Sequence, residues 1–232
     1  MGKNDSVIKN ISYDQSEILH NIMVLHNDGK PFDADMTYST GGFYASRKNG
    51  YTIPEPLMKF DVCPQTEDTV KIEPLGKLPL EDNSLSSLVI DLPFVISPRD
   101  CKSMVVNKDT SCIIAKRFSS YYPVTEMFES YHHWINEAYR VLKEDGICIF
   151  KTQGTISGGK CYLTPEYSWL CAENCGFYTI DQFFLMAKAR LISGKVKKQE
   201  HARKYSSTFY VFKKVGGKKK INYFKFMDNN DK

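Results

Sequence analysis

Short apolar runs and longer amphipathic stripes alternate along this chain of 232 residues. Runs rich in β-branched and aromatic residues, bounded by Pro, Gly, Asn and Asp, predict strands over 32–34, 57–62, 70–73, 87–90, 147–151, 177–187 and 207–214. Apolar residues at helical spacing predict helices over 16–26, 125–143 and 164–175. Ser16 and Thr164 stand where N-caps are expected, and a glycine follows the first and the third helix closely.

The order of these elements favours an α/β fold. Helices lie between several of the strands, and parallel neighbours in a sheet require crossover connections of this kind. The last two strand runs, 177–187 and 207–214, are predicted to form an antiparallel pair, because the segment between them has few apolar residues. A glycine- and serine-rich stretch, 154–160, is predicted to be a loop.

The stretch 87–94 contains the clearest candidate for a functional site. Its strand ends at Asp91-Leu92-Pro93-Phe94, where the proline stops the hydrogen-bonded ladder. In open α/β sheets, ligands bind at the carboxyl ends of strands. There the Asp91 carboxylate and the Leu92 carbonyl can each accept one N–H of an exocyclic amine, and Phe94 can stack on the ring that carries it. A buried strand followed by an ordinary turn is the alternative.

This motif resembles the Asp/Asn-Pro-Pro-Tyr/Phe motif of the amino methyltransferases, which methylate an exocyclic nitrogen of adenine or cytosine. Asp91, Pro93 and Phe94 match it, whereas Leu92 replaces the first proline. The family uses the backbone carbonyl at this second position, so the change to leucine weakens rigidity more than function. The resemblance implies that all four residues form the catalytic motif.

The segment 31–43 resembles the cofactor loop of the same family, commonly Asp-Pro-x-x-Gly-Ser-Gly-Thr. Its tandem glycines let the backbone approach a ligand closely. The family's loop cradles the amino-acid end of S-adenosylmethionine, and the resemblance implies that Asp35, Tyr38, Ser39 and Gly41 bind this cofactor. Ser39 replaces the family's first glycine. A surface turn is the alternative.

Two further acidic residues stand at predicted strand ends. Asp61 closes the run 57–62, where class I methyltransferases hold the cofactor ribose, and a charged acceptor suits its two hydroxyl groups. A strand-terminating turn is the alternative for Asp61. Glu73 closes the run 70–73, one position before the family's acidic residue near the adenine, and the resemblance assigns it to the cofactor site.

Three more segments resemble class I methyltransferases. The connector 77–84 resembles Leu-Pro-Phe-x-Asp-Asn-Ser, and 137–146 resembles the helix end Arg-x-Leu-Lys-Pro-Gly-Gly. Small adenine-type DNA methyltransferases of phages and prophages share the connector and the terminal His-Ala-Arg-Lys-Tyr at 201–205. The resemblance implies a Rossmann-like class I methyltransferase fold, with a mostly parallel seven-stranded sheet and an antiparallel last strand.

We expect one domain over residues 16–214, a flexible N-terminus over 1–15 and a basic flexible tail over 215–232. The polar segment 97–122 is expected either to close over a substrate or to be an insertion. Seven scattered cysteines without a Cys-x-x-Cys pair indicate reduced thiols and a cytoplasmic protein. No membrane span is expected, and no metal site, since His132 and His133 have no partner at ligand spacing.

Positive charge suggests the class of partner. A net charge of +4 permits nucleic-acid binding without requiring it. The segment 188–204 has a single acidic residue, and we expect it to contact phosphates through Lys188, Arg190, Lys195, Lys197, Lys198, Arg203 and Lys204. A solvated basic loop is the alternative.

Together these features predict a methyltransferase that uses S-adenosylmethionine and acts on an exocyclic amine of a nucleic-acid base. Adenine N6 in DNA is favoured, with cytosine N4 as a second target. Three alternatives stay open: an RNA adenine N6-methyltransferase, an enzyme acting on a protein glutamine amide, and a catalytically weak nucleic-acid-binding subunit.

Overall fold

Eight strands form the main sheet of the computed structural model, which describes residues 7–45, 50–96, 120–189, 199–216 and 221. In spatial order the strands are β1 (Ile11–Ser12), β9 (Phe177–Met186), β10 (Ser206–Lys214), β6 (Leu142–Thr152), β5 (Leu85–Ile90), β2 (Ala34–Asp35), β3 (Met58–Asp61) and β4 (Val70–Lys71). All neighbours are parallel except the pairs that β10 makes with β6 and β9. The predicted Rossmann-like fold with an antiparallel last strand is confirmed. The two-residue β1, which lies inside the predicted N-terminal segment, adds an eighth strand at the edge.

The strand order reverses between β2 and β5. Later strands β3 and β4 extend the sheet on one side of β2, whereas β5 and β6 extend it on the other. At such a switch point the loops that follow the two central strands leave in opposite directions, and a crevice opens between them. The fold therefore places the ends of β2 and β5 side by side at the position where α/β sheets bind ligands.

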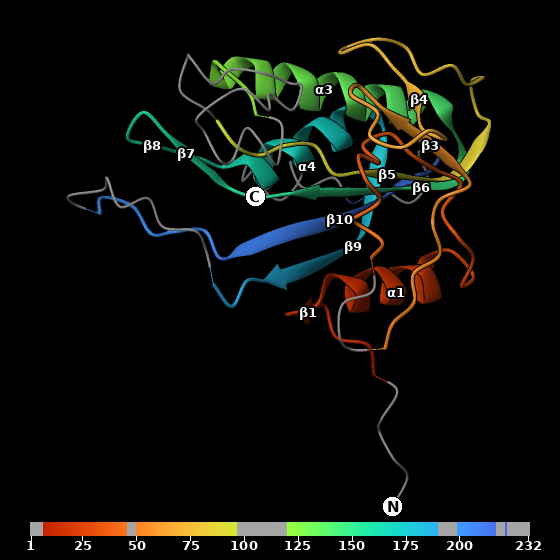
Figure 1. Ribbon diagram of the computed structural model, residues 1–232, viewed down its shortest axis with the longest axis horizontal. Helices are drawn as coiled ribbons and strands as arrows, with labels where there is room; N and C mark the ends of the chain where they lie inside the picture. The colour runs from red at the N-terminus through yellow and green to blue at the C-terminus, as the bar shows by residue number, and fades with distance from the viewer. Residues whose placement is uncertain (1–6, 46–49, 97–119, 190–198, 217–220, 222–232) are drawn as a thin grey trace, which may run out of the picture.

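Helices cover both faces of this sheet (Figure 1). They are α1 (Gln15–His26), α3 (Val124–Val141) and α4 (Thr164–Cys175). The helices α3 and α4 pack together on one face over a core that includes Trp134 and Phe150. On the other face, α1 covers a second core that includes Ile18 and Phe209. No helix within the described ranges is long and apolar enough to cross a membrane.

Both predicted N-caps are wrong, although the helices begin close to the predicted positions. The N-cap of α1 is Asp14, whose Oδ1 accepts a hydrogen bond from the N–H of Ser16 at 2.9 Å. The N-cap position of α4 is Leu163, which makes no side-chain capping bond, and Thr164 is already helical. A capping side chain must lie outside the first turn, so a one- or two-residue shift in the helix start changes which residue caps it.

The predicted loop over 154–160 is instead a β-hairpin. Its strands are β7 (Thr155–Ser157) and β8 (Lys160–Tyr162), joined by Gly158 and Gly159. Both glycines have positive φ, 56° and 69°, which a two-residue hairpin turn of type I′ requires. The tandem glycine between two short β-prone runs was therefore the hairpin signal.

Gly176, which ends α4, allows a close contact that any larger residue would prevent. Its φ is 117°, and an added Cβ would lie 2.7 Å from the hydroxyl oxygen of Tyr139. Because backbone strain adds to a steric clash, we expect Gly176→Ala to lower the free energy of unfolding by about 2–5 kcal/mol. Urea denaturation measures this loss. Gly29→Ala is the matched control, since its φ is 70° but nothing lies within 4 Å of an added Cβ. It should cost only the strain, about 1–2 kcal/mol, and equal losses in both variants would contradict the role of the contact with Tyr139.

Candidate active site

Three acidic residues stand at the carboxyl ends of neighbouring strands around the switch point. Asp35 is the last residue of β2, Asp61 is the last residue of β3, and Asp91 directly follows β5. Because the three strands are parallel, their carboxyl ends lie at the same edge of the sheet. The structure therefore brings together the three carboxylates that the sequence places at strand ends.

The carboxyl group of Asp35 is fully buried and acts inside the fold. Its Oδ1 accepts hydrogen bonds from the N–H and the hydroxyl group of Thr37, at 2.6 and 2.9 Å, and its Oδ2 accepts one from the Tyr44 hydroxyl group at 2.7 Å. Burial raises the pKa of Asp35 to about 7, the hydrogen bonds from Tyr44 and Thr37 oppose this rise, and the charge of Asp91 adds to it. Asp35 thus shapes the loop from within and presents no oxygen directly to a ligand.

Thr37 joins the two loops that leave the switch point. Its hydroxyl group donates to Asp35 and accepts a hydrogen bond from the backbone N–H of Asp91 at 2.8 Å. A hydroxyl group can donate once while it also accepts, so Thr37 bridges both partners at the same time. The backbone of Asp91 is therefore held relative to β2 independently of its own side chain.

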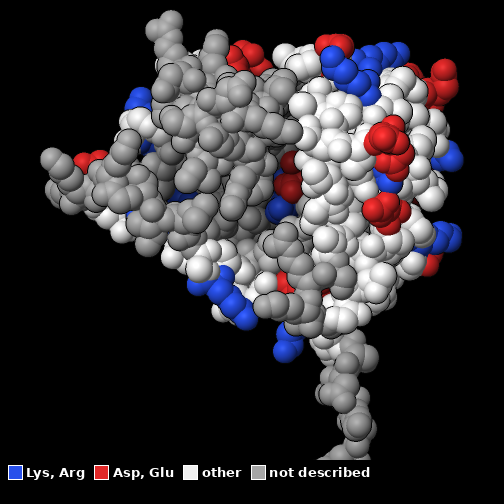
Figure 2. Space-filling view, viewed as in Figure 1, with Lys and Arg blue, Asp and Glu red and all other residues white. Residues whose placement is uncertain are grey.

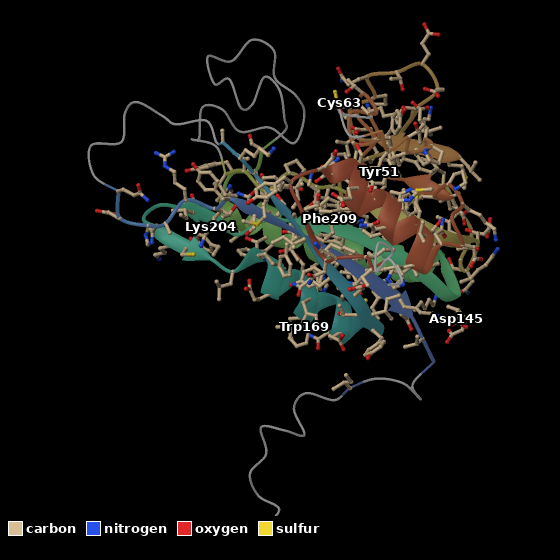
Figure 3. All side chains as sticks on the ribbon, turned by 90° about the horizontal axis from the view of Figure 1, so that it is seen from below. Tyr51, Cys63, Asp145, Trp169, Lys204 and Phe209 are labelled. Carbon is tan, nitrogen blue, oxygen red and sulfur yellow. The ribbon has the colours of Figure 1, made fainter. Side chains whose placement is uncertain are left out.

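The side chain of Asp91 forms an ion pair with Lys151 on the adjacent strand β6. Lys151 Nζ lies 2.9 Å from Asp91 Oδ2, and the two side chains are only 11% and 23% exposed. The ammonium group also lies 5.1 Å from the ring centroid of Phe43 and 5.7 Å from that of Phe209, a residue of β10 that Figure 3 labels. The aromatic rings exclude water on one side of the pair, which strengthens the attraction between the two charges.

The two residues that follow Leu92 in the motif are anchored through their carbonyl groups. The carbonyl of Pro93 accepts a hydrogen bond from the Tyr131 hydroxyl group at 3.0 Å, and the carbonyl of Phe94 accepts one from the Thr155 hydroxyl group. The Leu92 side chain is buried, but no described residue donates a hydrogen bond to its carbonyl. Within the described ranges, the Leu92 carbonyl is thus without a donor, at the position where the resemblance implies an acceptor.

The glycine-containing turn after β2 adjoins a hollow of about 260 Å³. The residues around the hollow are Thr40, Gly41, Gly42, Tyr44, Ala45, Ile53 and Glu55. An added Cβ on Gly41 would lie 2.5 Å from the Tyr38 hydroxyl oxygen, so glycine lets this ring pack on the turn. Ser39 has a φ of 54°, the left-handed conformation that glycine adopts at the least cost. Among the described residues, the backbone N–H groups of Thr40 and Gly42 have no acceptor and remain available to an anion.

Asp61 stabilises the same turn and keeps acceptor capacity. Its Oδ2 accepts a hydrogen bond from the N–H of Ser39 at 2.8 Å, and its Oδ1 accepts one from the N–H of Cys63 at 2.7 Å. Burial raises the pKa of Asp61, and these two hydrogen bonds oppose the rise. Each carboxylate oxygen has two lone pairs, so Asp61 can accept two further hydrogen bonds from hydroxyl groups.

Glu73 and the basic segment 188–204 are the remaining predicted features of the site. The Glu73 side chain is 77% exposed, and its ion partner is Lys71 at 3.9 Å. The segment 188–204 joins the end of β9 to the start of β10, at the same edge of the sheet as Asp91. Figure 3 shows Lys204 at one end of the molecule, and the side-chain amide of Gln153 donates to its carbonyl at 3.4 Å.

Part of this basic segment lies outside the described residues. Lys188, Arg203 and Lys204 are described, whereas four of the predicted phosphate contacts are not: Arg190, Lys195, Lys197 and Lys198. Residues 97–119 of the predicted substrate-closing segment also lie outside the described ranges. Figure 2 shows Lys and Arg side chains along the lower left of the described surface and a mixture of both charges on its right.

Sequence reasoning missed three residues of the site: Thr37, Tyr44 and Lys151. Thr37 and Tyr44 are neutral and stand close to the predicted cofactor loop, where no pattern separates them from ordinary loop residues. Lys151 ends the predicted strand 147–151, so its place at the same edge of the sheet as Asp91 was predictable, but its pairing with Asp91 was not. Ile90 pairs with Phe150 in the parallel register, which places the next residue of each strand side by side.

Comparison with known proteins yields distant likenesses only. No protein-family model and no curated protein matches the chain. Among solved structures, it resembles the PvuII DNA methyltransferase (cytosine-N4-specific), with 15% identity over 59% of this chain and 45% of that one and a TM-score of 0.38. It also resembles a Thermus thermophilus protein described as a DNA modification methylase, crystallised with S-adenosyl-L-methionine (11% identity, 63% and 54% coverage, TM-score 0.38).

A third likeness, to the [4+2]-cyclase SpnF, has 13% identity over 87% of this chain and 81% of that one, with a TM-score of 0.46. This chain spans about half the length of the first two proteins. Such likenesses are too distant to carry an argument about chemistry. The topology is that of a Rossmann-like class I methyltransferase fold, and three carboxylates stand at its switch point.

The buried carboxyl group of Asp35 should make stability depend on pH. Its pKa is raised in the folded protein, so its contribution to stability is fully present below pH of about 4 and is lost as the pH rises towards 7. Asp35→Asn keeps an oxygen that can accept from Thr37 but has no charge to bury. Between pH 4 and 7 we expect its free energy of unfolding to fall less than that of the unchanged protein, measured by urea denaturation. Parallel curves for the two proteins would show that Asp35 does not carry this dependence.

Proposed function

We propose that this chain is a methyltransferase that uses S-adenosylmethionine and acts on an exocyclic amine of a nucleic-acid base. One observation carries the proposal: the Asp91 carboxylate lies at the switch point next to the Leu92 carbonyl, to which no described residue donates, and beside the glycine-containing turn. Two acceptors next to each other suit the two N–H groups of a planar amine. Adenine N6 in DNA is the first target of the proposal, and cytosine N4 is the second.

The groups around the turn suit each part of the cofactor. The N–H groups of Thr40 and Gly42 would bind the cofactor carboxylate, and Glu55, which lines the hollow, would bind its ammonium group. Asp61 would accept hydrogen bonds from the ribose hydroxyl groups. Tyr38, Ser39 and Gly41 form the wall of the turn, and in this proposal Asp35 acts on binding through the shape of the loop. When bound, S-adenosylmethionine supplies an electrophilic methyl group on a sulfonium centre.

The motif would prepare the amine for attack. The lone pair of an exocyclic amine is delocalised into the ring, so the nitrogen is a weak nucleophile. Hydrogen bonds to Asp91 and to the Leu92 carbonyl favour a pyramidal nitrogen, whose lone pair then points at the methyl group in line. Pro93 and Phe94 hold this geometry, and the Phe94 ring would stack on the base after it leaves the duplex.

The nucleic-acid part of the proposal depends on charge and position. Lys188, Arg203 and Lys204 belong to the connection between β9 and β10, whose ends lie at the same edge of the sheet as Asp91, and we propose that they contact phosphates next to an extruded base. Structured RNA carries the same phosphates and the same adenine amine, so an RNA adenine N6-methyltransferase is the first alternative. A glutamine amide has the same two N–H groups, but phosphate contacts do not help to bind it.

A catalytically weak, nucleic-acid-binding protein is the second candidate function, and one observation favours it. Lys151 already occupies one oxygen of Asp91, which reduces the acceptor capacity of the carboxylate. Cofactor binding without measurable methyl transfer would support this candidate. Incubation with labelled cofactor and plasmid DNA, total RNA or protein separates it from the three enzymatic possibilities.

Asp61 provides a test of the cofactor site that does not need a known substrate. Asp61→Asn removes a charged acceptor for two hydroxyl groups, so we expect the affinity for S-adenosylmethionine to fall by about 1.5–3 kcal/mol, measured by calorimetry. Asp33→Asn is the matched control, because Asp33 Oδ2 also accepts two backbone N–H groups, from Ser86 and Ser87, but lies before β2 at the other end of the strand. Asp33→Asn should bind the cofactor normally, and equal affinities in both variants would remove Asp61 from the site.

The motif itself is tested by removing its carboxylate without leaving a buried charge. Asp91→Ala alone would leave the ammonium group of Lys151 without its partner, which is destabilising. We therefore expect the clearest result from Asp91→Ala combined with Lys151→Met: methyl transfer lost by at least about 100-fold, with cofactor affinity within threefold of the unchanged protein. Label transfer to DNA and calorimetry provide the two measurements. Transfer close to the normal rate would show that Asp91 has no part in the reaction.

A further inference from the structure

The side chain of Lys151 is largely buried, whereas lysine side chains are usually exposed. Its side chain is 11% exposed, its Nζ lies 2.9 Å from Asp91 Oδ2, and two aromatic rings line the other side of the ammonium group. Burial of an ammonium group costs several kcal/mol unless a partner compensates it. The arrangement therefore needs Asp91 in its charged form.

The charged and titratable groups around the pair come from several elements. Asp35 at the end of β2, Tyr44 in the turn and Tyr131 on α3 each lie close enough to Asp91 for its charge to raise their pKa values. The two tyrosines stay neutral, because burial raises the pKa of each well above its usual value. Lys151 is thus the only cation that the described residues place against the carboxylate.

We propose that Lys151 is a positioning residue for the transfer reaction, which holds Asp91 Oδ2 so that Oδ1 and the Leu92 carbonyl are left to accept the two N–H groups of the substrate. This inference rests on the proposed function and extends it. It assigns Asp91 the role of a fixed hydrogen-bond acceptor. A carboxylate beside a cation is a poor base, since protonation would leave the cation unpaired.

The fate of the proton follows from this pairing. The nitrogen–methyl bond forms as the sulfur–methyl bond breaks, and the positive charge moves from sulfur to nitrogen. The nitrogen then loses one proton, which restores a neutral amine. With Lys151 in place, this proton passes to water rather than to Asp91.

Four variants test the proposal. Lys151→Met keeps the length and the apolar stem that packs near Phe43 and Phe209 but removes the charge, whereas Lys151→Arg keeps the charge. Lys151→Gln, which is polar and of similar length, replaces the methionine variant if that one does not fold. Lys213→Met is the matched control, because it breaks a lysine–aspartate ion pair of 2.8 Å with Asp145. Lys213 pairs with Ile147 of β6, four residues before Lys151, and Figure 3 shows Asp145 away from Phe209, the residue that pairs with Lys151.

Two readouts apply to each variant: kcat and KM for label transfer, and cofactor affinity by calorimetry. In Lys151→Met we expect kcat to fall at least tenfold, with KM for the nucleic acid within threefold of that of the unchanged protein. Cofactor affinity should stay within threefold. Lys151→Arg should restore kcat to within about threefold, and Lys213→Met should match the unchanged protein.

Each result has a defined meaning. Equal or higher kcat in Lys151→Met, or a loss of kcat that Lys151→Arg does not rescue, overturns the proposal while the methyltransferase function stands. A chain that neither binds the cofactor nor transfers label overturns the proposed function, and this inference with it. A fall in kcat at unchanged KM, which Lys151→Arg rescues, supports the positioning role.

Discussion

A buried carboxyl group holds the two loops of the switch point together. Asp35 is fully buried and accepts three hydrogen bonds. One of them comes from the hydroxyl group of Thr37, which also accepts a hydrogen bond from the backbone N–H of Asp91. Buried polar groups must be satisfied internally, so the loop after β2 can adopt only the few conformations that supply these donors. Both the glycine-containing turn and the start of the motif depend on this constraint.

The same edge of the sheet contains three carboxyl groups whose charges would repel one another. The structure reduces this repulsion in three different ways. Burial raises the pKa of Asp35 to about 7, which leaves that group partly protonated near neutral pH. Asp91 is paired with Lys151, and Asp61 accepts hydrogen bonds from two backbone N–H groups. Different environments thus give three chemically identical side chains three different tasks, inside the fold, at the motif and at the turn.

The order and the type of most elements could be predicted from the sequence, because they depend on local periodicity. Apolar residues at helical spacing placed α3 within two residues of its observed bounds, and the strand that precedes Asp91 lies inside β5. The prediction failed where a shift of one or two residues changes which residue caps a helix or forms a turn. Asp14 caps α1 in place of Ser16, and the tandem glycine over 158–159 forms a hairpin turn rather than an open loop. Hydrogen-bond geometry at helix and strand ends decides such positions.

The sequence by itself determined which residues stand at strand ends, since a proline, an acid or a glycine interrupts each apolar run there. It therefore placed Asp35, Asp61 and Asp91 at one edge of the sheet. Only the tertiary structure decided what each of them contacts. Lys151 lies 60 positions after Asp91 in the chain, and the two meet because β6 pairs with β5 in one particular register. Register is set by how whole strands bury their apolar faces, so no local pattern around either residue contains it.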